Sequence, residues 1–189
     1  AVDISGTLEF DDTGKVDFKQ FGIQLLPLER MGWPSANAQV DADGHFELKN
    51  VGPSLWRVEL YAAAAYIKSI RAGDRDLESR EFDTTQGFSG PLTIRVGTKM
   101  GALQGTVRAE SGTPKMIMLA PADAAPNRRS MYQQRGRSDA TGRFSIPNLR
   151  PGKYRVFAVE ESSFGFDPGQ MPQDSGVEVN IEEGQTATI

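Results

Sequence analysis

The residues best suited to hold a metal ion lie around His45, the only histidine of the 189-residue chain. Asp41 and Asp43 stand just before it, and imidazole and carboxylate groups are common ligands of divalent cations. Zinc sites use three or four protein ligands, and a calcium loop needs a further oxygen ligand and a later bidentate Glu that this segment lacks. Asp11 and Asp12 could supply oxygens only if the fold brought them close. The sequence therefore favours a solvated turn made by Asp and Gly, and we predict no metal and no cofactor.

Nucleophilic catalysis lacks a framework in this chain. There is no cysteine, and the segment Gly87-Phe88-Ser89-Gly90 does not match the Gly-x-Ser-x-Gly turn that exposes a catalytic serine. Neighbouring carboxylates such as Glu160 and Glu161 occur, but nothing in the sequence aligns them across a substrate. We therefore expect that the chain is not an enzyme and has no catalytic residue.

Three aromatic residues of the first half could form a binding surface. Trp33 lies between turn residues in Met31-Gly32-Trp33-Pro34-Ser35, where an exposed indole could stack on a sugar ring or on an apolar partner. Tyr61 and Tyr66 could extend that surface. The alternative is that the loop folds Trp33 over the open end of a small core, and the sequence leaves both interpretations open.

A short cationic stretch in the second half could bind an anionic partner. Residues 127–137 contain Arg128, Arg129 and Arg135 near Tyr132, and arginine with an interleaved aromatic can bind nucleic acid or an acidic polymer. The net charge of the whole chain is −4 and its pI is about 5.1, which argues against nucleic acid as a partner. A solvated loop or strand edge is the other interpretation. If the stretch has a partner, an anionic glycan or a neighbouring domain fits it.

These candidate residues belong to elements that occur twice in the chain. Residues 41–58, DADGHFELKNVGPSLWRV, align without a gap with residues 139–156, DATGRFSIPNLRPGKYRV, and 8 of the 18 positions are identical. The opening segments match as well, Ile4-Ser5-Gly6-Thr7-Leu8 with Leu103-Gln104-Gly105-Thr106-Val107. Self-similarity of this kind indicates a duplicated structural unit. We place the boundary near Thr98, which predicts one domain over residues 1–98 and a second over residues 99–189.

Both copies show the period-two alternation of apolar residues that is typical of β-strands. Phe46 and Phe144 open equivalent alternations, and turn pairs such as Asp-Gly and Pro-Gly separate successive runs. Trp56 and Tyr154 fall in phase with the apolar residues, which predicts core aromatics rather than binding residues. Short strands at this spacing predict an all-β chain of two tandem antiparallel sandwiches.

The repeated block, Asp-x-x-Gly-x-Phe-x-[Leu/Ile]-x-Asn-[Val/Leu]-x-Pro-x-x-[Trp/Tyr]-Arg-Val, resembles the signature of carboxypeptidase regulatory-like domains. These are similar to the transthyretin-like (prealbumin-like) module that follows the catalytic domain of some metallocarboxypeptidases. The family's opening strand, an apolar residue and then x-Gly-x-Val, is similar to Ile4-x-Gly6-x-Leu8. Residues 66–71, YIKSIR, resemble a strand of bacterial members, whereas the second copy has no clear counterpart between residues 157 and 176. The resemblance covers nearly the whole chain and implies, in each copy, an immunoglobulin-like Greek-key sandwich of about seven strands.

In bacteria this resemblance implies a multidomain protein that is exported, with an extracellular, periplasmic or cell-surface location. Our leading prediction is a non-catalytic pair of accessory modules that spaces, stabilises or docks neighbouring domains or another protein. The alternative is a carbohydrate-binding module that takes a polysaccharide, because starch-binding-like modules share the sandwich architecture. No run of roughly 20 apolar residues is present, so we expect no direct membrane insertion.

Overall fold

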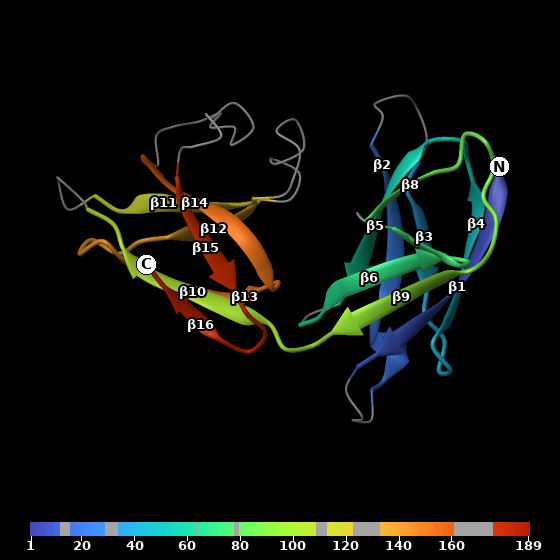
Figure 1. Ribbon diagram of the computed structural model, residues 1–189, viewed down its shortest axis with the longest axis horizontal. Coiled ribbons are helices and arrows are strands. Elements are labelled where there is room, and N and C mark those ends of the chain that lie inside the picture. Colours follow the sequence, from blue (N-terminus) through green and yellow to red (C-terminus); the bar gives the residue numbers. More distant parts are fainter. Residues whose placement is uncertain are drawn as a thin grey trace. The chain divides into compact units, whose positions relative to one another are not determined.

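The chain folds into two compact units, unit 1 (Ala1–Thr98) and unit 2 (Lys99–Ile189), both made of β-strands (Figure 1). The computed structural model describes residues 1–11, 16–28, 34–62, 64–77, 80–108, 113–122, 133–160 and 176–189. Within these residues the only helical element is a 3-10 turn, η1 (Phe18–Gln20). The predicted fold class, all-β with immunoglobulin-like sandwiches, is confirmed.

Unit 1 contains a five-stranded sheet of order β4-β1-β9-β6-β7 and a four-stranded sheet of order β3-β2-β5-β8. Its strands are β1 (Val2–Phe10), β2 (Gly22–Pro27), β3 (Ala36–Gln39), β4 (His45–Val51), β5 (Leu55–Tyr61), β6 (Tyr66–Ala72), β7 (Arg75–Leu77), β8 (Glu81–Asp83) and β9 (Leu92–Gly97). The segment that resembles a strand of bacterial family members is therefore a strand, β6.

Unit 2 contains a three-stranded sheet of order β13-β10-β16 and a four-stranded sheet of order β12-β11-β14-β15. Its strands are β10 (Gly101–Thr106), β11 (Lys115–Pro121), β12 (Gln134–Arg137), β13 (Arg143–Leu149), β14 (Gly152–Glu160), β15 (Val177–Ile181) and β16 (Thr186–Thr188). β10 to β14 repeat β1 to β5 in order and pairing, and β16 takes the place of β9. Strands equivalent to β6 and β7 are absent from the described residues of unit 2.

The structure departs from the predicted sandwich in two respects. Unit 1 has nine described strands rather than about seven, because the β6–β7 hairpin extends its larger sheet beyond β9. The sandwiches are also not wholly antiparallel. The first and last strands of each unit, β1 with β9 and β10 with β16, pair in parallel. A period-two pattern specifies which face of a strand is buried but not the direction of its neighbour, so the parallel pairing could not be predicted from it.

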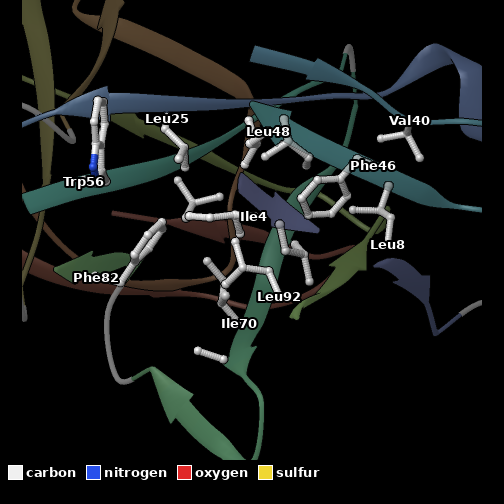
Figure 2. Close-up of a cluster of buried hydrophobic side chains, with 14 of the residues drawn as sticks. Ile4, Leu8, Leu25, Val40, Phe46, Leu48, Trp56, Ile70, Phe82 and Leu92 are labelled. Carbon is white, nitrogen blue, oxygen red and sulfur yellow. The ribbon is translucent and has the colours of Figure 1, made fainter. Parts of the chain in front are cut away.

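The core of unit 1 lies between its two sheets. Figure 2 shows Trp56 and Leu25, from the four-stranded sheet, pointing toward Ile4, Ile70 and Leu92 of the five-stranded sheet. Unit 2 has a separate core in which equivalent strands supply the buried residues: Leu103, Ile117, Leu119, Phe144, Ile146, Leu149, Tyr154, Val156, Val179 and Ile181. In β4 and β13 the buried residues alternate along the first half of the strand, as burial of one sheet face requires.

The glycine shared by the two opening strands is explained by close packing. A Cβ atom at Gly6 would lie 2.2 Å from the ring of Phe46 and 2.6 Å from the carbonyl oxygen of Leu92. A Cβ atom at Gly105 would lie 2.8 Å from the ring of Phe144 and 2.5 Å from a carbonyl oxygen. The repeated Phe therefore lies over the backbone of the first strand, and only glycine leaves it room.

The shared asparagine has a backbone role. Asn50 and Asn148 are the non-glycine residues with positive φ among those described, at 54° and 57°. Each lies next to an irregularity in the pairing of its strand with the opening strand of the unit. Asparagine tolerates this left-handed conformation better than most residues, which accounts for its presence at both positions.

Candidate functional site

Asp41, one of the carboxylates considered above as a metal ligand, stabilises a hairpin turn. Oδ1 of Asp41 accepts hydrogen bonds from the backbone N–H groups of Asp43, at 2.9 Å, and His45, at 2.8 Å. These bonds, that from His45 foremost, hold the pKa of Asp41 below its usual range. The arrangement is that of an Asx turn, in which the side chain occupies the amides that follow it.

The second hairpin repeats this arrangement without a histidine. Oδ1 of Asp139 accepts hydrogen bonds from Oγ1 of Thr141, at 2.7 Å, and from the backbone N–H groups of Thr141 and Arg143, at 2.8 and 3.0 Å. The Thr141 hydroxyl is the main cause of a lowered pKa at Asp139. Among the described residues, no three His, Cys, Asp or Glu side chains gather in a way that could hold a metal ion.

The predicted aromatic and arginine candidates are not brought into one described site. Trp33, Arg128 and Arg129 lie outside the described residues. Tyr61 is 79% exposed at the end of β5, and Arg135 is exposed on β12.

The expectation that Tyr66 belongs to an exposed surface is wrong, because it is only 4% exposed. Tyr66 is the first residue of β6, and its ring lies against the backbone of Gly97 at the end of β9. A Cβ atom at Gly97 would lie 2.6 Å from the Tyr66 hydroxyl. The sequence of residues 66–71, YIKSIR, does not show which strand pairs with it, so the burial of Tyr66 against Gly97 could not be predicted.

Trp56 and Tyr154 occupy the same position in the two copies of the repeat, and both are buried. Each side chain hydrogen-bonds to the backbone that precedes its strand. Trp56 Nε1 donates to the Gly52 carbonyl and to Oγ1 of Thr84, both at 3.0 Å. The Tyr154 hydroxyl donates to the Arg150 carbonyl at 2.9 Å, so both side chains bond to the residue four positions earlier. Thr84, a buried hydroxyl that also donates to Gly52, was not found from the sequence, since an isolated Thr gives no pattern. These aromatics are structural.

A hollow with a volume of about 470 Å³ lies on unit 2, where β12 ends and β13 begins. Six residues line it: Arg137, Ser138, Asp139, Arg143, Phe144 and Ser145. The two arginines are exposed, whereas the Phe144 ring is buried in the core of unit 2.

The equivalent residues of unit 1 have different chemistry. Alignment of the repeats places Gln39 at the position of Arg137, Val40 at that of Ser138 and Glu47 at that of Ser145. The Gln39 side chain donates to the backbone carbonyls of Lys19 and Phe21, at 2.7 and 2.8 Å, so the chain around η1 occupies this side of unit 1. Unit 2 thus carries two guanidinium groups where unit 1 carries an amide and an imidazole.

The hollow is chemically suited to an anionic group. Guanidinium groups bind carboxylate, sulfate or phosphate oxygens through paired N–H donors. Asp139, the one acidic side chain in the lining, already accepts three hydrogen bonds from its own turn. The lining includes no histidine or cysteine that could act as a base or nucleophile.

The outward faces of the two four-stranded sheets also differ. In unit 1, Gln24 of β2 lies opposite Glu59 of β5, and Glu59 forms ion pairs with Arg57 at 2.9 Å and Arg80 at 3.2 Å. In unit 2 the same pairing joins two apolar residues, Met118 of β11 and Phe157 of β14.

In unit 2 the apolar character spreads along this face. Met118 and Phe157 form a buried cluster with Ala120, and Met116 and Val159 pack against it. β11 is therefore buried on both faces, a pattern that departs from simple alternation.

Comparison with known proteins identifies no family for this chain. No family model and no curated protein matches it. Among solved structures, the minor pilin GBS52 of Streptococcus agalactiae is 12% identical with a TM-score of 0.40, over 98% of this chain and 93% of that one. A streptococcal ancillary pilin is 13% identical with a TM-score of 0.42, over 99% and 60%. Similarity at this level does not establish a function.

The described residues contain no helix long and apolar enough to cross a membrane.

Proposed function

We propose that this chain is a non-catalytic pair of carboxypeptidase regulatory-like modules that acts as a spacer between other parts of an exported or cell-surface protein. The observation that carries the proposal is the structural role of the residues that the two units share. Asp41 and Asp139 form the turns, Phe46 and Phe144 fill the cores, and the shared asparagines adopt positive φ. What the repeat retains is a scaffold, while its surfaces differ.

The connection between the units supports a spacing role. β9 ends at Gly97 and β10 begins at Gly101, so only three residues separate the last strand of unit 1 from the first strand of unit 2. A connection this short limits how far two folded units can move independently, whereas long Gly- or Ser-rich linkers behave as flexible coils.

The spacing role is tested by the distribution of distances between the two units. Because the chain has no cysteine, Asp43→Cys and Glu182→Cys, both at exposed positions, give two unique sites for spin labels. A spacer should show one narrow distance distribution by pulsed electron resonance. A control with ten Gly/Ser residues inserted after Thr98 should broaden it. A distribution as broad in the unaltered chain as in this control would contradict the proposal.

Binding of an acidic polysaccharide is the second candidate function. The favouring observation is the hollow of unit 2, which two exposed arginines, Arg137 and Arg143, line. The neutral-sugar alternative based on Trp33 remains a prediction, since Trp33 lies outside the described residues.

Affinity electrophoresis separates the two ligand types. A polyuronate in the gel should retard the chain, and Arg143→Ala should reduce the retardation, whereas Arg95→Ala, an exposed arginine of unit 1, should not. Retardation by a neutral glucan that disappears in Trp33→Ala would favour the Trp33 site instead. No retardation in either gel would leave only the spacing role.

A further inference from the structure

The first and last strands of unit 1 form its one parallel pair among the described strands. β1 and β9 run side by side with five residues in register, from Gly6 opposite Leu92 to Phe10 opposite Val96 (Figure 1). The chain enters β1 at Val2 and leaves β9 at Gly97, so entry and exit lie at opposite ends of this ladder.

This geometry determines how tension along the chain acts on the unit. A pull on both ends drives β1 toward Val2 and β9 toward Gly97, in opposite directions along the same ladder. All the ladder hydrogen bonds are then loaded together, and they must break nearly at once for the strands to slide. Neighbours that are antiparallel, such as β1 and β4, would be opened from one end and lose one bond at a time.

Unit 2 repeats the arrangement with a shorter ladder. β10 and β16 are parallel, with three residues in register, from Ala102 opposite Thr186 to Gln104 opposite Thr188. The backbone N–H of Ile189 adds a bond to the Gln104 carbonyl at 3.1 Å. Entry and exit again lie at opposite ends, so a pull on the chain shears this ladder as well.

The last strands of the two units are held to very different degrees. β9 also pairs with β6, over six residues, and buries three core side chains, Leu92, Ile94 and Val96. β16 has no second partner strand among the described residues, and Ala187 is the side chain that it packs against the core of unit 2.

We infer that the chain resists tension in two steps. Unit 2 unfolds first, and unit 1 unfolds only at a higher force. The inference rests on the proposed spacing role, because tension reaches the units only if the chain links two attachment points. Since the three-residue connection joins β9 directly to β10, the same tension passes through both ladders. Yielding of unit 2 would lengthen the chain while unit 1 keeps the link intact.

Single-molecule force measurement on the whole chain tests the inference. With one cysteine added before Ala1 and one after Ile189, each pull should give two unfolding events, each lengthening the chain by roughly 300 Å. Ile189→Pro removes the N–H that bonds to Gln104 and should lower the force of the weaker event alone. A loss of force in the stronger event would overturn the assigned order.

The direction of pulling provides the matched control. Attachment before Ala1 and at Pro53→Cys, an exposed turn residue beside the Val2–Val51 end of the β1–β4 pair, opens unit 1 from one end. The force needed should then be several-fold lower than in the end-to-end geometry, although the folded protein is the same. Equal forces in the two geometries would overturn the inference that the β1–β9 ladder resists tension. The distance distribution that tests the spacing role does not depend on either result.

Discussion

The two units share a scaffold but differ on the outward face of the four-stranded sheet. At paired positions, Gln24 and Glu59 of unit 1 are replaced by Met118 and Phe157 of unit 2. The polar pair is partly exposed and joined to arginines, while the apolar pair is buried. A duplicated sandwich can therefore keep one face fixed for its core and change the other face from a hydrated surface to an apolar layer.

The largest effect is expected from exchanging the residue types at the equivalent positions Glu59 and Phe157. Phe157→Glu should destabilise unit 2 by about 4 kcal/mol or more, since it removes a buried ring and buries an unpaired carboxylate. Glu59→Phe should cost unit 1 less, about 2 kcal/mol, because it removes two partly buried ion pairs.

The two units can be followed separately in denaturant. Both tryptophans belong to unit 1, so indole fluorescence reports that unit, while hydrogen exchange of the β14 amides reports unit 2. Similar losses from the two exchanges would show that the outward faces are equivalent after all.

Truncation of the repeated phenylalanine should affect both units alike. Phe46→Ala and Phe144→Ala should each cost about 3–5 kcal/mol, because each ring is buried over the glycine of its opening strand. The midpoint of the affected unit should fall in urea while the other unit keeps its own. An unchanged midpoint in either variant would contradict the assigned packing of that ring.

Substitution of the shared asparagines tests whether positive φ has the same role in both units. Asn50→Val and Asn148→Val should each destabilise their unit by about 1–2 kcal/mol, since a β-branched residue is strained at positive φ. Asn50→Gly is expected to lose less stability than Asn50→Val, because glycine adopts positive φ freely. Both variants keep the backbone N–H that donates to Oδ1 of Asp3. If glycine and valine were equally harmful at residue 148, the positive φ would not explain the repeat.

The smallest expected effect concerns pH. The folded-state pKa of Asp139 is lowered from 3.8, so its contribution to stability is present above that value and is lost as pH falls through the lower folded-state pKa. Asp139→Asn keeps an oxygen acceptor without the charge, and it should flatten the acid loss of stability in unit 2 below about pH 4. Thermal midpoints at a series of pH values measure this, with Asp41→Asn as the counterpart in unit 1. An identical acid dependence in Asp139→Asn and the parent would show that the turn carboxylate does not contribute.

Patterns in the sequence are sufficient to predict the duplication, many of the strands and the main core positions. Alternation identifies buried positions such as Phe46 and Trp56 because a strand face repeats every two residues, and the gap-free match of residues 41–58 with 139–156 establishes the repeat. The repeat predicts a domain boundary near Thr98, and the two compact units of the structure divide between Thr98 and Lys99.

Which strands are neighbours, and which side chains the outward-facing residues contact, is visible only in the tertiary structure. It buried the Tyr66 ring against Gly97, brought the distant Thr84 to Trp56, and set β1 parallel to β9. Each of these depends on contacts between segments far apart in the chain, and a local pattern carries no information about the partner. The apolar face around Phe157 likewise depends on which residues are paired across the sheet, because the equivalent pair in unit 1 is Gln24 and Glu59.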